Sequence, residues 1–194
     1  MSNKPRILAF AGATREGSLN KKLVRIAAEG ARQAGAEVTT IDLGDYPLPI
    51  YDGDFESAQG LPANAKKLKQ LMESHDGLLI SSPEYNSSLP AVLKNVIDWA
   101  SRKADPDEAS LSAFAGKGAA IMSVSPGGLG GIRGLVHLRS ILGNIQVLVL
   151  PDQKTIPHGV QAFDDDGTLK DPRQQAAVSA LGAKLTAMLG KLKA

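Results

Sequence analysis

The stretch "RILAFAGATREGSLN", from Arg6 to Asn20, decides the fold because an apolar run, a glycine-rich polar turn and the beginning of an amphipathic helix follow one another. The segment from Arg6 to Gly12 is apolar after its first residue, which is typical of a parallel strand covered on both faces. A helix is predicted from about Ser18 to Ala34, with Gly35 closing it. Its apolar face consists of Leu19, Leu23, Ile26, Ala27 and Ala31.

The rest of the chain repeats this alternation of short apolar runs with amphipathic stretches. Further strands are predicted at Ala36 to Leu43, Gly77 to Ser82, Ala119 to Ser125 and Ile145 to Leu150. Further helices are predicted at Pro62 to Ser74, at Ser88 to Arg102 with Ser88 as its cap, at Gly131 to Leu142 and from about Arg173 onward, with a loop at Gly44 to Gly60. Five strands joined by crossover helices predict one α/β domain, residues 1–194, with a doubly wound open parallel sheet.

The composition excludes several classes of function. The 194 residues include 22 basic and 20 acidic ones, and a net charge of +2 gives no reason to expect a nucleic-acid partner. There is no cysteine, so redox chemistry requires an organic cofactor. Three scattered histidines lack metal-ligand spacing, and we predict no metal site. The N-terminal apolar run is too short for a membrane span, so we expect a cytoplasmic protein without a membrane partner.

The loop "GATREGSLNKK" after the first predicted strand resembles a triphosphate-binding loop, but Ser18 stands where that pattern requires lysine. The missing lysine argues against a nucleoside triphosphate with Mg²⁺. A phosphate monoester needs less: backbone N–H groups at a helix beginning, hydroxyls, the Asn20 amide and the charge of Arg15 suffice. The alternative is an ordinary glycine turn capped by Ser18.

Two more polar turns follow predicted strands and precede predicted helices. In "SPEYNSS", the residues Glu84, Tyr85 and Asn86 have no evident structural role and would suit a planar heterocycle. "SPGGLGGIRG" does not fit the dinucleotide pattern, but its glycines let backbone approach a flat ligand. A tight polar turn and a flexible loop are the respective alternatives. Because the carboxyl ends of parallel strands share one edge, all three loops are expected to meet there.

Taken together, these loops resemble the NAD(P)H-dependent FMN reductases, a flavodoxin-like family that includes chromate, quinone and azo-dye reductases. The resemblance covers nearly the whole chain and is most specific in "SPEYNSSLPAVLKNVIDWASR" and in "GGLGGIRGLVHLRSIL" followed by "VLPDQ". It implies a flavodoxin-like sheet of five parallel strands in the order 2-1-3-4-5. It also implies FMN as cofactor, NADPH or NADH as hydride donor, and a homodimer or homotetramer.

The resemblance also assigns residues to the cofactor. It places the FMN phosphate among Arg15, Ser18, Leu19 and Asn20, and the isoalloxazine ring among Pro83, Glu84, Tyr85, Asn86, Ser87, Ser123, Gly127 and Gly128. Two positions depart from the family, which commonly has serine where Ala13 stands and often has glycine where Ser87 stands.

The implied reaction transfers hydride from NAD(P)H to bound FMN and then reduces a small-molecule acceptor, which is a quinone, free flavin, an azo compound or chromate. No side-chain acid or base is required, and the helix beginning near Gly130 is expected to stabilise negative charge on the ring. One alternative is a flavodoxin-type electron carrier, and another is a nucleotide-binding regulatory module. The sequence distinguishes neither the acceptor nor NADH from NADPH. It also leaves Trp99 either in the core or at a subunit interface.

Overall fold

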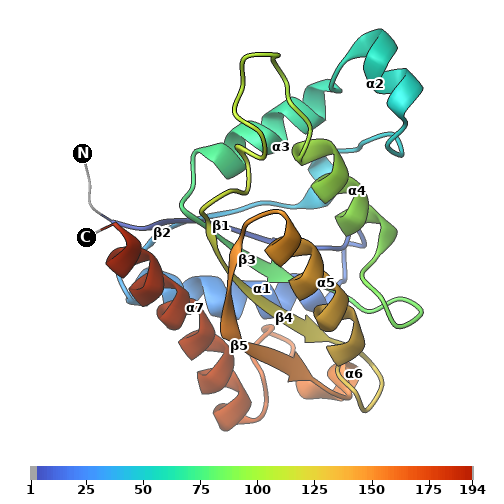
Figure 1. Ribbon diagram of the computed structural model, residues 1–194. Coiled ribbons are helices and arrows are strands. Elements are labelled where there is room, and N and C mark those ends of the chain that lie inside the picture. The colour runs from blue at the N-terminus through green and yellow to red at the C-terminus, as the bar shows by residue number, and fades with distance from the viewer. Residues whose placement is uncertain (1–3, 194) are drawn as a thin grey trace.

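Five parallel strands form one sheet in the order β2-β1-β3-β4-β5, which confirms the predicted strand order (Figure 1). The computed structural model describes residues 4–193. The strands are β1 (Arg6–Ala11), β2 (Glu37–Thr40), β3 (Gly77–Ser81), β4 (Gly118–Val124) and β5 (Leu148–Ile156). After β2 the chain crosses to the other side of β1 to form β3. The winding therefore reverses between β1 and β3, and the loops that follow these two strands diverge and leave a crevice between them.

Helices cover both faces of the sheet (Figure 1). They are α1 (Leu19–Gln33), α2 (Gly53–Gln59), α3 (Ala63–Glu73), α4 (Ala91–Ala100), α5 (Ile132–Asn144), α6 (Gly159–Ala162) and α7 (Pro172–Leu192), with a short 3₁₀ helix at Leu43–Asp45. Alternate residues of β1 face opposite sides, so that Ala9 packs with α1 and α7 and Phe10 packs with α3, α4 and α5. Within residues 4–193 none of the helices combines the length and the apolarity that a membrane span requires.

Glycines let α1 and α7 approach each other closely on their face of the sheet. A Cβ atom at Gly182 would lie 1.9 Å from the carbonyl oxygen of Ala27, and one at Gly30 would lie 2.1 Å from that of Ser179. Any larger residue at either position would push the helices apart. This contact fixes the second half of α1 against α7.

The fifth strand differs from its prediction at both ends, because β5 spans Leu148–Ile156 and the sequence predicts Ile145 to Leu150. Helix α5 continues to Asn144, and Gln146 turns the chain in a left-handed conformation with φ of 67°. The strand then extends through polar residues because it is an edge strand, paired only with β4. Pro151 is tolerated there because an edge strand leaves one row of N–H positions unpaired.

The segment predicted as a loop at Gly44 to Gly60 contains part of the 3₁₀ helix and the whole of α2. The carboxylate of Asp52 caps α2 by accepting hydrogen bonds from the N–H groups of Asp54 and Phe55 at 2.8 and 2.9 Å. Trp99 is fully buried against this segment, and its Nε1–H donates to the carbonyl of Pro49 at 2.8 Å. Trp99 therefore completes the core.

Candidate functional site

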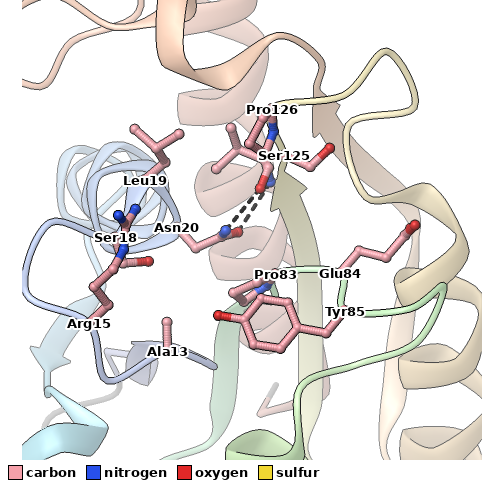
Figure 2. Close-up of a pocket in the computed structure, with 11 residues that line it drawn as sticks. Ala13, Arg15, Ser18, Leu19, Asn20, Pro83, Glu84, Tyr85, Ser125 and Pro126 are labelled. Atoms are coloured by element: carbon pink, nitrogen blue, oxygen red, sulfur yellow. Dashed lines mark hydrogen bonds between the residues drawn. The ribbon is translucent and has the colours of Figure 1, made fainter.

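Three loops that follow β1, β3 and β4 meet at the carboxyl edge of the sheet and enclose a crevice of about 250 Å³ (Figure 2). Seven of the twelve residues predicted to bind the cofactor line it: Arg15, Ser18, Leu19, Asn20, Pro83, Glu84 and Tyr85. Ala13, Val124, Ser125 and Pro126 complete the lining. The expected convergence of the three loops is therefore present.

The loop after β1 presents backbone N–H groups that have no acceptor. Within residues 4–193, the N–H groups of residues 13–17 donate no hydrogen bond. Among the described residues, the N–H groups of Leu19 and Asn20 also lack a backbone acceptor, whereas that of Lys21 donates to the carbonyl of Ser18 at 3.1 Å. Ser18 occupies the N-cap position, yet its hydroxyl makes no capping hydrogen bond to the helix. The loop therefore does not form a turn capped by its own Ser18 side chain, and the backbone N–H groups of the loop are available to an anion.

Asn20 holds this loop against the sheet. Its side chain is 4% exposed, and its Nδ2–H donates to the carbonyl of Val124 at 2.9 Å. Its Oδ1 accepts from the N–H of Val124 at 3.1 Å (Figure 2). The same Oδ1 also accepts from the hydroxyl of Ser81 at 2.8 Å. Asn20 thus joins the beginning of α1 to β3 and β4 and fixes the position of the free N–H groups.

The basic residues near the loop divide into one exposed side chain and two engaged ones. The guanidinium of Arg15 is exposed and bonds only the carbonyl of Gly17, at 3.1 Å, in the described part of the chain. Lys21 instead forms a 2.5 Å ion pair with Asp42 and donates to the carbonyl of Thr14 at 3.1 Å. Lys22 lies over the ring of Phe163. Arg15 is therefore the cation that can turn toward an anion in the crevice.

The loop after β3 ends in a tight turn at Asn86 and Ser87. Both residues have left-handed backbone conformations, with φ of 50° and 66°. Tyr85 and Ser88 exchange two backbone hydrogen bonds across them, at 2.9 and 3.1 Å, as in a type I′ turn. Asn86 and Ser87 lie outside the crevice lining, and Tyr85 remains 60% exposed. The turn thus presents the Tyr85 ring, which points toward Ala13 in Figure 2.

Ser88 does not cap the following helix, contrary to the prediction. Pro90 is the N-cap residue of α4, and the hydroxyl of Ser88 pairs with Nδ1 of His137 at 2.9 Å. The reason is that the turn at Asn86 and Ser87 directs Ser88 toward α5.

Glu84 connects the loop after β3 to the beginning of α5. Its carboxylate forms an ion pair with Arg133, whose Nε lies 2.8 Å from Oε1, and its Oε2 accepts from the N–H of Gly134 at 3.1 Å. Burial favours a higher pKa for Glu84, but these hydrogen bonds outweigh it and lower the pKa below its ordinary value. In Figure 2 the side chain points away from the centre of the crevice. The N–H group of Gly134 is thus occupied by the chain's own carboxylate. The expected role of this helix beginning in stabilising negative charge on the ring stays a prediction.

The remaining predicted residues lie beside the crevice and do not line it. Ser123 is fully buried on β4, and its hydroxyl has no hydrogen-bond partner among the residues that the structure describes. Gly131 covers it so closely that a Cβ atom there would lie 1.9 Å from that hydroxyl oxygen. A Cβ atom at Gly128 would lie 3.8 Å from the imidazole of His158, and one at Gly127 would lie 4.0 Å from the hydroxyl oxygen of Ser125. The glycine loop therefore forms the rim.

Ser125 and Pro126 line the crevice, but the sequence-based assignment does not include them. Their signal is present in the sequence, since a Ser-Pro pair follows both β3 and β4, as Ser82-Pro83 and Ser125-Pro126. Proline fixes φ and removes an N–H group, so both pairs make rigid, partly apolar walls at the same edge of the sheet.

The crevice therefore has two chemically different ends. The end near α1 offers free backbone N–H groups, the Ser18 hydroxyl and the Arg15 charge, which suit a phosphate group. The other end consists of Pro83, Tyr85 and Pro126, which suit an apolar ring. A planar heterocycle that carries one phosphate matches both ends. An FMN molecule has this constitution, and the residues present fit it.

Comparison with known families gives the same answer. Residues 5–161 match the model of a family described as NADPH-dependent FMN reductase. The chain belongs to the NADPH-dependent FMN reductase family. This family uses NAD(P)H as electron donor and FMN as flavin cofactor, and its members are oxidoreductases. The predicted family, class of enzyme and cofactors are thereby confirmed.

Individual members of the family are similar over most of the chain. A quinone reductase of Escherichia coli is 37% identical over 151 residues, which are 77% of this chain and 76% of that protein. An NAD(P)H-dependent FMN reductase of Pseudomonas aeruginosa is 34% identical over 92% of this chain and 91% of its own. The solved structure of FerB, a flavoenzyme NAD(P)H:(acceptor) oxidoreductase from Paracoccus denitrificans, superposes with a TM-score of 0.77 at 26% identity, covering 96% and 98% of the two chains.

Proposed function

We propose that the crevice binds FMN, with the phosphate at residues 13–18 and the ring between Tyr85 and Pro126. We further propose that NAD(P)H reduces a small-molecule acceptor by way of the bound FMN. The observation that carries the proposal is the row of backbone N–H groups without acceptors in the loop after β1. Ala13 is buried and residues 14–17 are exposed, so these N–H groups lie together at the surface next to a helix beginning, where a phosphate group can reach them.

At the phosphate end, the chain's own groups bind and orient the ligand. The N–H groups of residues 13–17 and the Ser18 hydroxyl donate hydrogen bonds to the phosphate oxygens, and Arg15 supplies an opposite charge. Ala13 provides no hydroxyl where the family commonly has one. The neighbouring Thr14 hydroxyl supplies the replacement donor in this proposal. Asn20 positions the loop through its contacts to β3 and β4 and contributes little to binding directly.

At the ring end, the chain contributes shape and leaves one side open. Pro83 is buried and rigid, whereas Tyr85 is 60% exposed, so a nicotinamide and then an acceptor have room to stack in turn. Bound FMN supplies the redox chemistry by taking two electrons and a proton from NAD(P)H and passing them to the acceptor. The predicted contacts of Asn86, Ser87, Ser123, Gly127 and Gly128 stay predictions for the rim.

We propose a quinone as the acceptor. The support is that relatives in Escherichia coli and Pseudomonas putida are named quinone reductases. Free flavin, azo compounds and chromate are the competing acceptors, because an open stacking site selects weakly among flat or small oxidants.

The test is anaerobic. The protein is loaded with FMN, freed of excess and mixed with NADPH or NADH while the visible absorbance of the flavin is followed. Rapid bleaching, followed by return of the absorbance on addition of benzoquinone, is the expected result. Bound flavin that stays yellow would indicate an electron carrier, and a chain that retains no FMN would refute the site.

We further infer a homodimer or homotetramer, in a protein that the sequence predicts to be cytoplasmic. The support is an apolar groove of about 570 Å³ between α4 and α5, next to which Val136 is 59% exposed. Sedimentation as a monomer at micromolar concentration would contradict this inference.

A further inference from the structure

Glu84 differs from the other crevice residues because its carboxylate is paired with groups of the same chain. Its side chain is 7% exposed, whereas that of its partner Arg133 is 55% exposed. One carboxylate oxygen accepts from Arg133 and the other accepts from the N–H of Gly134. No other acid lines the crevice within residues 4–193. Glu84 is thus the only negative charge that the described part of the chain places in the crevice lining.

The carboxylate replaces a missing helix cap. Gly131 is the N-cap residue of α5, has no side chain and adopts a left-handed conformation with φ of 88°. Gly134 is the third residue of α5, so its N–H group is one of those left without an acceptor inside the helix. The end of a helix carries a partial positive charge, equivalent to roughly half an elementary charge. Glu84 therefore offsets both this partial charge and the full charge of Arg133.

We propose that Glu84 sets the reduction potential of the bound flavin by neutralising Arg133 and the beginning of α5, and that its side chain does so without contacting the ring. This inference rests on the proposed function. Reduction adds two electrons and one proton to FMN and leaves one negative charge on the ring. Positive charge near the crevice favours the reduced cofactor, and negative charge disfavours it. The ion pair keeps the local field close to neutral.

The same geometry predicts opposite effects for the two partners. Glu84→Gln keeps an oxygen for Gly134 but leaves Arg133 unpaired, so it adds positive charge at the crevice and raises the potential. Arg133→Gln leaves the Glu84 carboxylate without its cation and lowers the potential. The second shift is smaller, because the exposed Arg133 side chain is already screened by solvent. The double variant restores approximate neutrality, so its reduction potential should return toward that of the unmodified protein.

The experiment measures the midpoint potential of FMN-loaded protein against a reference dye, with the affinities for oxidised and reduced FMN determined separately. For Glu84→Gln we expect the ratio of these affinities to change about tenfold toward the reduced form, which corresponds to about 30 mV for a two-electron couple. Asp98→Asn is the matched control, because it breaks an exposed ion pair with Lys94 on α4 and should leave the potential unchanged. Thermal unfolding of each apoprotein verifies folding.

The outcomes separate a charge effect from a structural one. Opposite shifts in the two single variants, reversed in the double variant, support the inference. Shifts in the same direction, or shifts below twofold in the affinity ratio, overturn it, because loosened loops would weaken both redox forms alike. A chain that retains no FMN in its unmodified form refutes the proposed function itself, and this inference with it.

Discussion

The helices α1 and α5 both begin at the carboxyl edge of the sheet, yet their first turns differ. The beginning of α1 follows five residues whose N–H groups have no acceptor within residues 4–193, and Ser18 leaves the helix without a side-chain cap. The beginning of α5 receives the carboxylate of Glu84, which is itself paired with Arg133. We propose that the beginning of α1 binds a ligand anion because the chain supplies none there, whereas the beginning of α5 is already occupied by Glu84. The predictions below alter one or the other.

The largest effect is expected from giving α1 the anion that α5 already has. Ser18→Asp places a carboxylate where the phosphate is proposed to bind, and repulsion between them should weaken FMN binding roughly 100-fold or more. The same change should stabilise the apoprotein by about 0.5–1 kcal/mol, because aspartate caps a helix and complements its dipole. Flavin fluorescence titration and thermal unfolding measure the two effects.

Ser18→Ala is the control for this prediction. It removes the hydroxyl without adding charge and should weaken FMN binding by less than about tenfold. If Ser18→Asp bound FMN as tightly as Ser18→Ala does, the phosphate would not lie at the beginning of α1.

The second prediction concerns the anchor of the open loop. Asn20→Ala removes a buried side chain and leaves both the N–H and the carbonyl of Val124 without their partner, which should lower the free energy of unfolding by about 2–4 kcal/mol. FMN affinity should fall with it, since the free N–H groups lose their fixed position. Urea unfolding measures the change. Asn64→Ala, which removes one surface hydrogen bond to Pro47, should remain within about 1 kcal/mol of the unmodified protein, and an equal loss in both would contradict the anchor.

A smaller and more selective effect is expected from Arg15→Gln. Loss of one charge-assisted hydrogen bond should weaken FMN binding by about 1.5–2 kcal/mol, which is roughly 10- to 30-fold. Riboflavin lacks the phosphate, so its affinity should not change. Parallel titrations with the two flavins distinguish the cases, and an equal loss for both would assign Arg15 to the ring end of the crevice.

The ion-paired carboxylate of Glu84 at the beginning of α5 predicts that the free energy of unfolding depends on pH. The folded-state pKa of Glu84 is lower than its ordinary value of 4.5, so the ionised carboxylate stabilises the fold above that pH and loses its effect as the pH falls through the folded pKa. Glu84→Gln should therefore be less stable by about 1–2 kcal/mol at pH 7, and the difference should shrink below pH 4.5. Urea unfolding at several pH values measures it. A difference that stays constant with pH would show that the charge contributes nothing.

The smallest effect concerns the turn that presents Tyr85. Ser87 has a positive φ of 66°, which glycine adopts without steric strain. Ser87→Gly should raise the free energy of unfolding by no more than about 1 kcal/mol, which a small rise in melting temperature would show. The gain is small because the relief of strain is partly offset by the greater freedom of glycine in the unfolded chain. Lower stability in this variant would mean that the serine side chain stabilises the turn.

The sequence predicted the parts of the fold that depend on local patterns. The apolar runs, the helical periodicity and the polar turns are all contained within short segments, so the five strands and the meeting of the three loops could be foreseen. The strand order was implied by the family resemblance. The end of β5 could not, because its polar residues from Asp152 to Thr155 form a strand only through pairing with β4.

The pairing of charged and polar side chains at the site could also not be predicted from the sequence. Glu84 and Arg133 are 49 positions apart, and Asn20 meets Val124 across 104 positions. No spacing rule links residues so distant, and the family resemblance assigned Glu84 and Asn20 to the cofactor. Only the folded chain shows that both side chains bind other parts of the protein.

The most direct test of the central claim compares FMN with riboflavin on the unmodified protein. The two ligands share the ring and differ by the phosphate, so the ratio of their dissociation constants isolates the contribution of the loop after β1. We predict that FMN binds at least about 100-fold more tightly, as expected for several charge-assisted hydrogen bonds. Equal affinities would contradict the account, because the unpaired N–H groups at the beginning of α1 would then not receive a phosphate.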